Sequence, residues 1–227
     1  MFGLEPQSTV ERVKSSGQPG RVPTFGESVL RGMIGFTLVS FGGFAPWVLA
    51  GRWFYRNVGE ARLYAACAVV FIGLSGLMLH RLIIGPGSLV RFYKIFSLAF
   101  LAYAIAWTIG WMMIRGNAGS IVGLLAGAAA MGALLAHGFK ARPAMLKVIV
   151  VLFAANAAGY FVGQWAHTAI PELQDGNVFG IALAKPTLAT LSGAAWGLFY
   201  GLGFGAGIGW AFHACQAETR KLVFDQK

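Results

Sequence analysis

The sequence predicts an all-α integral membrane protein, a bundle of about six transmembrane helices. Of its 227 residues, 57% are hydrophobic and only 11% are charged, whereas a soluble domain carries about a quarter charged residues. The apolar residues form long blocks of roughly 17 to 25 residues, the length that a helix needs to cross about 30 Å of hydrocarbon. These blocks cover residues 33–52, 63–84, 93–114, 118–138, 146–166 and 188–213.

Short polar segments separate the blocks. Gly85-Pro86-Gly87 is a turn signal that stops the second helix, and the few residues around Arg115, Gly116 and Asn117 predict a tight helical hairpin. The longest connection, 167–185, caps the bundle, lines an outer vestibule or is a plain surface loop. We expect a flexible cytoplasmic leader at 1–31, a transmembrane domain at 32–214 and a cytoplasmic tail at 215–227, because the leader is too polar to offset its ordering entropy.

The distribution of Lys and Arg predicts that both termini face the cytoplasm, since cytoplasmic segments are enriched in these residues. Five of the eighteen lie in the segments that this topology places outside: Arg52, Arg56, Arg62, Arg115 and Lys185. The other thirteen lie in the segments placed inside. Because they are spread over short loops and form no basic stripe, the net charge of +10 does not indicate nucleic-acid binding.

Several classes of chemistry lack their usual residues. None of the eight Asp and Glu residues falls within a predicted span, which argues against carboxylate-coupled transport. No nucleophile motif, zinc motif or phosphate-binding loop is present. The two cysteines, Cys67 and Cys215, lie near opposite faces of the predicted bundle and are not expected to form a disulfide.

The last block carries the strongest pattern, a glycine zipper. Glycine recurs there at every fourth position, which places the glycines along one slowly drifting stripe of a helix and lets another backbone approach closely. The stripe predicts close packing within the bundle or between protomers; the alternative is a smooth wall against a flat ligand or a lipid tail. Its members are Gly193, Gly197, Gly201, Gly205 and Gly209.

Three histidines, His80, His137 and His213, end the second, fourth and sixth blocks, which all finish on the same side. Each follows a small residue by four positions, a spacing that could leave room for haem or a pigment ligated by imidazole. The competing interpretation is that histidine is favoured at a helix C-terminus by the helix dipole. No cofactor is predicted outright, and a Soret absorption band would test the haem hypothesis.

Asn156 lies near the middle of the fifth block, with Gln164 about two turns further on. An amide in lipid needs a partner, so Asn156 is expected to form an interhelical hydrogen bond; the alternative is that both amides line a solute route.

The packing signal, beside so few reactive groups, favours a non-catalytic structural or accessory subunit that packs through its last helix in an oligomer or a larger membrane complex. The first alternative is a transporter or channel for a neutral or lipidic solute, and the second is a haem- or pigment-binding membrane redox protein. The expected partners are the lipid bilayer and other membrane helices. Short loops and a compact size favour a bacterial inner (cytoplasmic) membrane.

Overall fold

The computed structural model describes residues 2–17, 22–172, 177–178, 181–182 and 184–225. Within these residues the chain is almost entirely helical. The helices are α1 (Pro6–Ser15), α2 (Phe25–Asn57), α3 (Glu60–Leu79), η1 (His80–Leu82), α4 (Ser88–Ile114), α5 (Gly116–Gly138), η2 (Arg142–Ala144), α6 (Met145–Ala169), α7 (Lys185–Cys215) and α8 (Ala217–Phe224). Two two-residue strands, β1 (Asn177–Val178) and β2 (Ile181–Ala182), pair antiparallel in the connection before α7.

Five helical segments are long and apolar enough to cross a membrane: Phe25–Asn57, Glu60–Leu82, Ser88–Ile114, Gly116–Gly138 and Arg142–Ala169. Large apolar side chains on these helices stay exposed, such as Leu49 (82%) and Met113 (81%), as expected of a surface that lipid covers. The all-helical membrane-type bundle predicted from the sequence is therefore confirmed. α7 has 31 residues but is not among the five, because its many glycines contribute little hydropathy.

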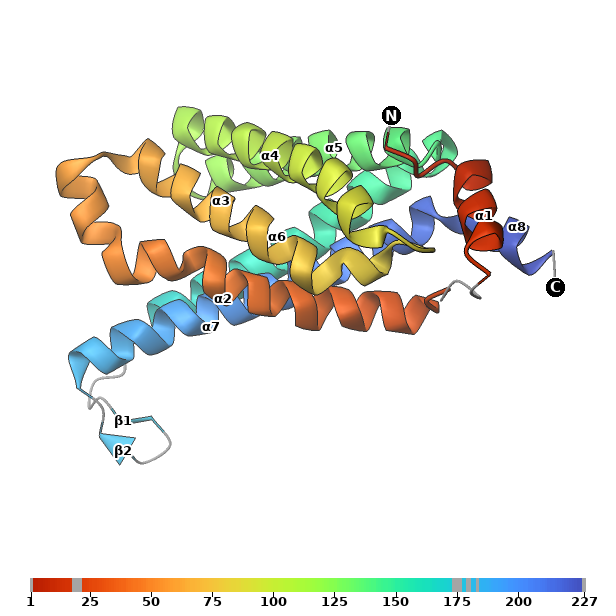
Figure 1. Ribbon diagram of the computed structural model, residues 1–227. Coiled ribbons are helices and arrows are strands. Elements are labelled where there is room, and N and C mark those ends of the chain that lie inside the picture. The colour runs from red at the N-terminus through yellow and green to blue at the C-terminus, as the bar shows by residue number, and fades with distance from the viewer. Residues whose placement is uncertain (1, 18–21, 173–176, 179–180, 183, 226–227) are drawn as a thin grey trace.

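The six long helices form a closed ring in which each packs mainly against two neighbours, in the order α2, α3, α4, α5, α6, α7 and back to α2. α7 packs most extensively, along α2 on one side and α6 on the other (Figure 1). The contact between α3 and α4 is the least extensive of the six. This loosest seam of the ring borders the cavity described below.

Both ends of the described chain lie at one end of the bundle, where α1 and α8 are side by side (Figure 1). We call this the terminal end, and the opposite end, which carries the α2–α3 and α4–α5 turns, the distal end. Residues 6–15 of the predicted flexible leader thus form α1, because Leu4 and Val10 are buried, at 1% and 7% exposure. Residues 173–176, 179–180 and 183 of the predicted loop 167–185, including Asp175, lie outside the described residues.

The first long helix begins at Phe25, eight residues before the start of the predicted span. Thr24 and Glu27 form a capping box, in which the Thr24 hydroxyl accepts from the Glu27 backbone N–H at 3.2 Å and the Glu27 carboxylate accepts from the Thr24 N–H at 3.0 Å. Such reciprocal bonds satisfy donors at a helix start that otherwise have no partner. These two hydrogen bonds therefore stabilise the first turn of α2.

Residues 82–86 form a tight loop at the terminal end, held from two sides by buried polar side chains. Arg91, 5% exposed, donates to the carbonyls of Ile84 (2.9 Å), Gly85 (3.1 Å) and Pro86 (2.8 Å). Gln216 accepts from the Ile84 N–H at 2.9 Å and donates to the Leu82 carbonyl at 2.8 Å. Gly85-Pro86-Gly87 does lie between the second and third long helices, as predicted, but α3 ends earlier, at Leu79, and η1 at Leu82, while α4 begins at Ser88.

Candidate functional site

The glycines of α7 lie against other helices of the same chain. A Cβ atom at Gly201 would lie 2.5 Å from the Cα of Thr37, and a Cβ at Gly205 or Gly209 would collide with a backbone carbonyl of α2. Gly193 and Gly197 face Val48 and Phe41 of α2 more loosely, with nearest approaches of 3.2 and 3.5 Å. On a second side of α7, a Cβ at Gly203 would lie 2.5 Å from the carbonyl oxygen of Ala155 on α6. Both glycine rows of α7 are therefore covered from within the bundle.

The three predicted histidines have different surroundings. The Nδ1 of His80 lies 2.9 Å from the Ser88 hydroxyl, and the Nδ1 of His213 lies 3.5 Å from the Ser28 hydroxyl, whereas His137 is exposed. The space beside Gly76, one turn before His80, is taken by the Tyr93 ring, and that beside Gly209 by the Ser28 carbonyl. Among the described residues, no three His, Cys, Asp or Glu side chains group as metal ligands. The haem hypothesis stays a prediction.

Asn156 is fully buried, and its Nδ2 donates to the Tyr103 hydroxyl on α4 at 2.8 Å. The interhelical bond expected of an amide within the membrane is therefore present, from α6 to α4. The Tyr103 hydroxyl lies 3.5 Å from the Tyr200 hydroxyl of α7, so three helices meet at this cluster. Nearby, the Tyr160 hydroxyl of α6 lies 3.0 Å from the Ser120 hydroxyl of α5.

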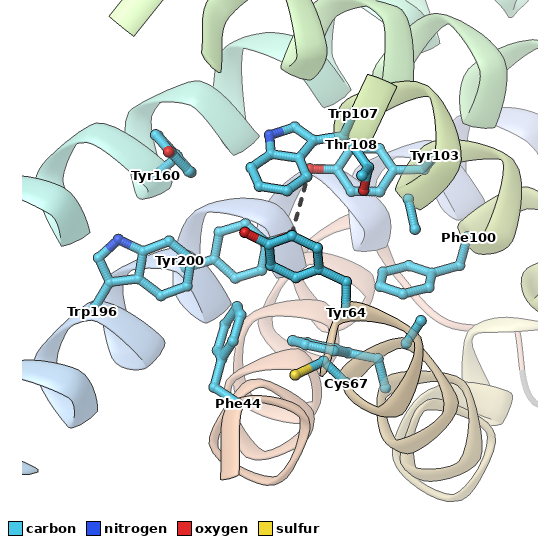
Figure 2. A pocket seen from close by; sticks show the side chains of 13 residues that line it. Phe44, Tyr64, Cys67, Phe100, Tyr103, Trp107, Thr108, Tyr160, Trp196 and Tyr200 are labelled. Carbon is cyan, nitrogen blue, oxygen red and sulfur yellow. Dashed lines mark hydrogen bonds between the residues drawn. The ribbon is translucent and has the colours of Figure 1, made fainter. Parts of the chain in front are cut away.

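The tyrosine cluster borders an aromatic cavity that opens toward the distal end. Its inner part has a volume of about 100 Å³ and lies between α3 and α4, lined among others by Phe100, Tyr103, Ala104, Thr108 and Tyr200 (Figure 2). Its outer part has a volume of about 360 Å³ and reaches Trp47, Tyr55, Glu60, Trp111, Gln164 and His167. The residues that line both parts are Phe44, Tyr64, Cys67, Trp107, Tyr160 and Trp196. The two parts therefore form one cavity.

Flat ring faces build much of the wall. The rings of Trp196 and Tyr200 are stacked with centroids 5.2 Å apart and planes 6° apart, and Trp107 stacks on Trp111 at 6.0 Å and 10°. Tyr64 meets the edge of Trp107 across the α3–α4 seam, with centroids 6.2 Å apart. Parallel ring faces favour a planar apolar molecule, because offset stacking adds to the free energy of apolar burial.

The cavity carries almost no charge. Among its described lining residues Glu60 is the only carboxylate, and it accepts a hydrogen bond from the Tyr64 hydroxyl at 2.8 Å. No Lys or Arg is among these lining residues. His167 lies at the mouth, with its ring 5.6 Å from that of Trp47. A charged molecule would lose its hydration in the inner part and gain no opposite charge there.

The cavity ends blindly toward the terminal end. Phenylalanine rings fill the core beyond Tyr103, with Phe100 stacked on Phe96 at 5.5 Å and Phe96 on Phe92 at 4.8 Å. Phe36 and Phe204 are also fully buried there. An open channel through the bundle is therefore absent from the described structure, and a bound molecule must arrive from the distal end or through the α3–α4 seam.

The sequence pointed to some of this site and missed most of it. Gln164, predicted to line a solute route, does line the outer part, whereas Asn156 lies behind Tyr103 and supports it. Both cysteines are free, as predicted, but that Cys67 lines the cavity was not foreseen. The missed signal was the tyrosines in the middle of apolar blocks, since a hydroxyl placed there needs a partner.

No family model matches this sequence, and neither a curated protein nor a solved structure matches it.

Proposed function

We propose that the protein is an integral membrane protein of six spanning helices that binds a neutral, lipid-soluble molecule in the aromatic cavity, as a carrier for that class of solute. The observation that carries the proposal is the cavity itself, a space of about 360 Å³ that adjoins a ring-walled inner part. Sites for small molecules are typically concave and mostly apolar, with a few polar groups that fix orientation.

The position of the cavity supports a ligand that arrives from the bilayer. It lies beside the seam between α3 and α4, the least extensive contact in the ring. A molecule dissolved in lipid could reach the inner part along this seam without crossing water. The lack of charge in the inner part supports a neutral ligand.

The remaining topology belongs to the same proposal. We count α7 as the sixth span because it is 31 residues long and closes the ring between α2 and α6. The excess of Lys and Arg near the terminal end favours a cytoplasmic location for both termini, in a bacterial inner membrane. An accessory subunit would have to bind its partners through surfaces other than the glycine rows of α7, which face α2 and α6.

Cys67 is a built-in reporter of the cavity, because it lines both parts. In a Cys215→Ser background, we expect decyltrimethylbenzene, a neutral hydrocarbon probe, to slow the modification of Cys67 by N-ethylmaleimide in liposomes. At a probe concentration about ten times Kd, roughly one cavity in eleven stays free, so modification should slow about tenfold. Mass spectrometry of the intact protein measures the rate.

Two variants of α4 make the test specific. Ala104 lines the inner part, so Ala104→Phe should fill it and remove the effect of the probe. Ile105 is 53% exposed on the outside of the same helix, so Ile105→Phe should retain the effect. If the probe never slows modification of the wild-type cysteine, or slows it equally in Ala104→Phe, the proposed function is wrong.

A further inference from the structure

Hydrogen-bond donors without partners gather around the inner part of the cavity. Resting on the proposed function, we infer that the bound molecule has a planar ring that carries carbonyl oxygens, the chemistry of a quinone. The inference follows from the hydroxyl protons that the inner part of the cavity leaves unused, together with the stacked rings that form its walls.

The first unused donor belongs to the pair Tyr103 and Tyr200. The Tyr103 hydroxyl accepts from Asn156 at 2.8 Å and faces the Tyr200 hydroxyl at 3.5 Å (dashed line in Figure 2). A pair of hydroxyls holds two protons, and only one of them can lie between the two oxygens. With the Asn156 amide donating, no other acceptor among the described residues contacts either hydroxyl, so one phenolic proton remains unused. The Asn156 Oδ1 is an acceptor that also has no partner, but it is buried behind Tyr103 without accessible surface. Both tyrosines line the inner part.

A second unused donor lies on the next turn of α4. Thr108 lines the inner part, and no hydrogen bond to its hydroxyl is found among the described residues. The Trp107 Nε1 also has no partner among these residues, but it is buried without accessible surface, so a molecule in the cavity cannot reach it. The hydroxyl proton of Tyr160, in contrast, has an acceptor. The Ser120 hydroxyl donates its own proton to the Gly116 carbonyl at 3.1 Å, so the Tyr160 hydroxyl donates to the Ser120 oxygen.

Unused hydroxyl protons in an apolar space favour a ligand with acceptor oxygens. An unmade hydrogen bond in such a space costs more than the net gain of an ordinary one. Carboxylate or phosphate oxygens would also accept, but no Lys or Arg lies among the described lining residues to offset their charge. Carbonyl oxygens on a planar ring meet both conditions, because the ring can also stack on faces such as those of Trp196 and Tyr200.

The test compares two probes that share tail and ring substituents, decyltrimethylbenzene and the fully substituted decyltrimethylbenzoquinone, in the Cys67 protection assay. The fully substituted quinone ring leaves no free position to which a thiol could add. We expect the quinone to protect Cys67 at about tenfold lower concentration than the hydrocarbon, the gain from one buried donor finding its acceptor.

The proton count makes a sharper prediction for variants. Tyr103→Phe and Tyr200→Phe, taken singly, each leave one hydroxyl proton unused and should keep the advantage of the quinone. Combined with Thr108→Val, the double variant removes the unused hydroxyl donors of the inner part and should lose most of the tenfold advantage, while the hydrocarbon still protects. Tyr93→Phe is the matched control, because the Tyr93 hydroxyl donates to the Gly73 carbonyl at 2.6 Å and does not line the cavity.

The outcomes separate the two proposals. If the quinone and the hydrocarbon protect at the same concentration, or if the triple variant with Thr108→Val keeps the full advantage of the quinone, the carbonyl inference is overturned and the proposed function stands. In that case water satisfies the unused donors. If neither probe protects the wild-type protein, the proposed function itself fails.

Discussion

Gly205→Leu is expected to unfold the bundle or to lower its stability by about 3 kcal/mol or more, the upper range for overpacking a tight core. A Cβ at Gly205 would collide with the carbonyl of Gly32, and a Cβ at Gly32 would collide with the carbonyl of Gly205. The two backbones therefore touch, and no side-chain rearrangement can make room for a leucine. Thermal unfolding of the purified protein in mild detergent, followed by gel filtration, measures the effect.

Gly73→Leu is the matched control for this change. Gly73 also lies in a membrane-spanning helix, α3, but a Cβ there would meet nothing within 4 Å. The control should change the unfolding temperature little, and Gly201→Leu should behave like Gly205→Leu because of the close approach to Thr37. Equal stabilities for Gly205→Leu and Gly73→Leu would mean that α7 does not pack closely on α2.

Arg91→Met should destabilise the terminal end by about 3 kcal/mol, because several buried carbonyls lose their donor at once and each unpaired group costs about 1–3 kcal/mol. The methionine keeps much of the apolar volume but leaves the carbonyls of Ile84, Gly85 and Pro86 unpaired. Arg91→Lys should recover part of the loss, since an ammonium group can reach fewer of these acceptors at once. Hydrogen exchange of residues 82–91 would show where the structure opens.

Arg81→Met controls for the loss of a positive charge at the same end, because Arg81 is exposed and should tolerate the change. A similar loss of stability in both variants would assign the effect to charge. A loss confined to Arg91→Met assigns it to the buried hydrogen bonds. The distinction matters because the sequence offers Arg91 only as one more positive charge at a helix end.

The fold was largely predictable from the sequence because block length and apolarity are local properties. The helix start at Phe25 was also readable, from Thr24 and Glu27 at the spacing of a capping box. The partner of the glycine stripe was not readable, since a run of glycines predicts a close approach without saying to which helix. The structure gives α2 as that partner through Thr37 and Gly32.

The candidate site was harder to predict because it depends on side chains that five helices bring together. Asn156 was recognisable as an amide that needs a partner, but nothing local indicates that the partner is Tyr103, fifty-three positions earlier in the chain. Trp107 and Trp196 were unremarkable among seven tryptophans. Cys67 gave no signal at all, since a single cysteine in an apolar block is typically a packing residue.

Photolabelling tests most directly whether the cavity binds a neutral, lipid-soluble molecule. The reconstituted protein is irradiated with decyltrimethylbenzene that carries a diazirine on its ring, and the labelled residues are identified by mass spectrometry. We expect label on cavity residues such as Tyr64, Ala104 and Trp107, displaced by excess unlabelled hydrocarbon. Label confined to lipid-facing residues such as Val69 and Met113, which are 70% and 81% exposed, would contradict a binding site in the cavity.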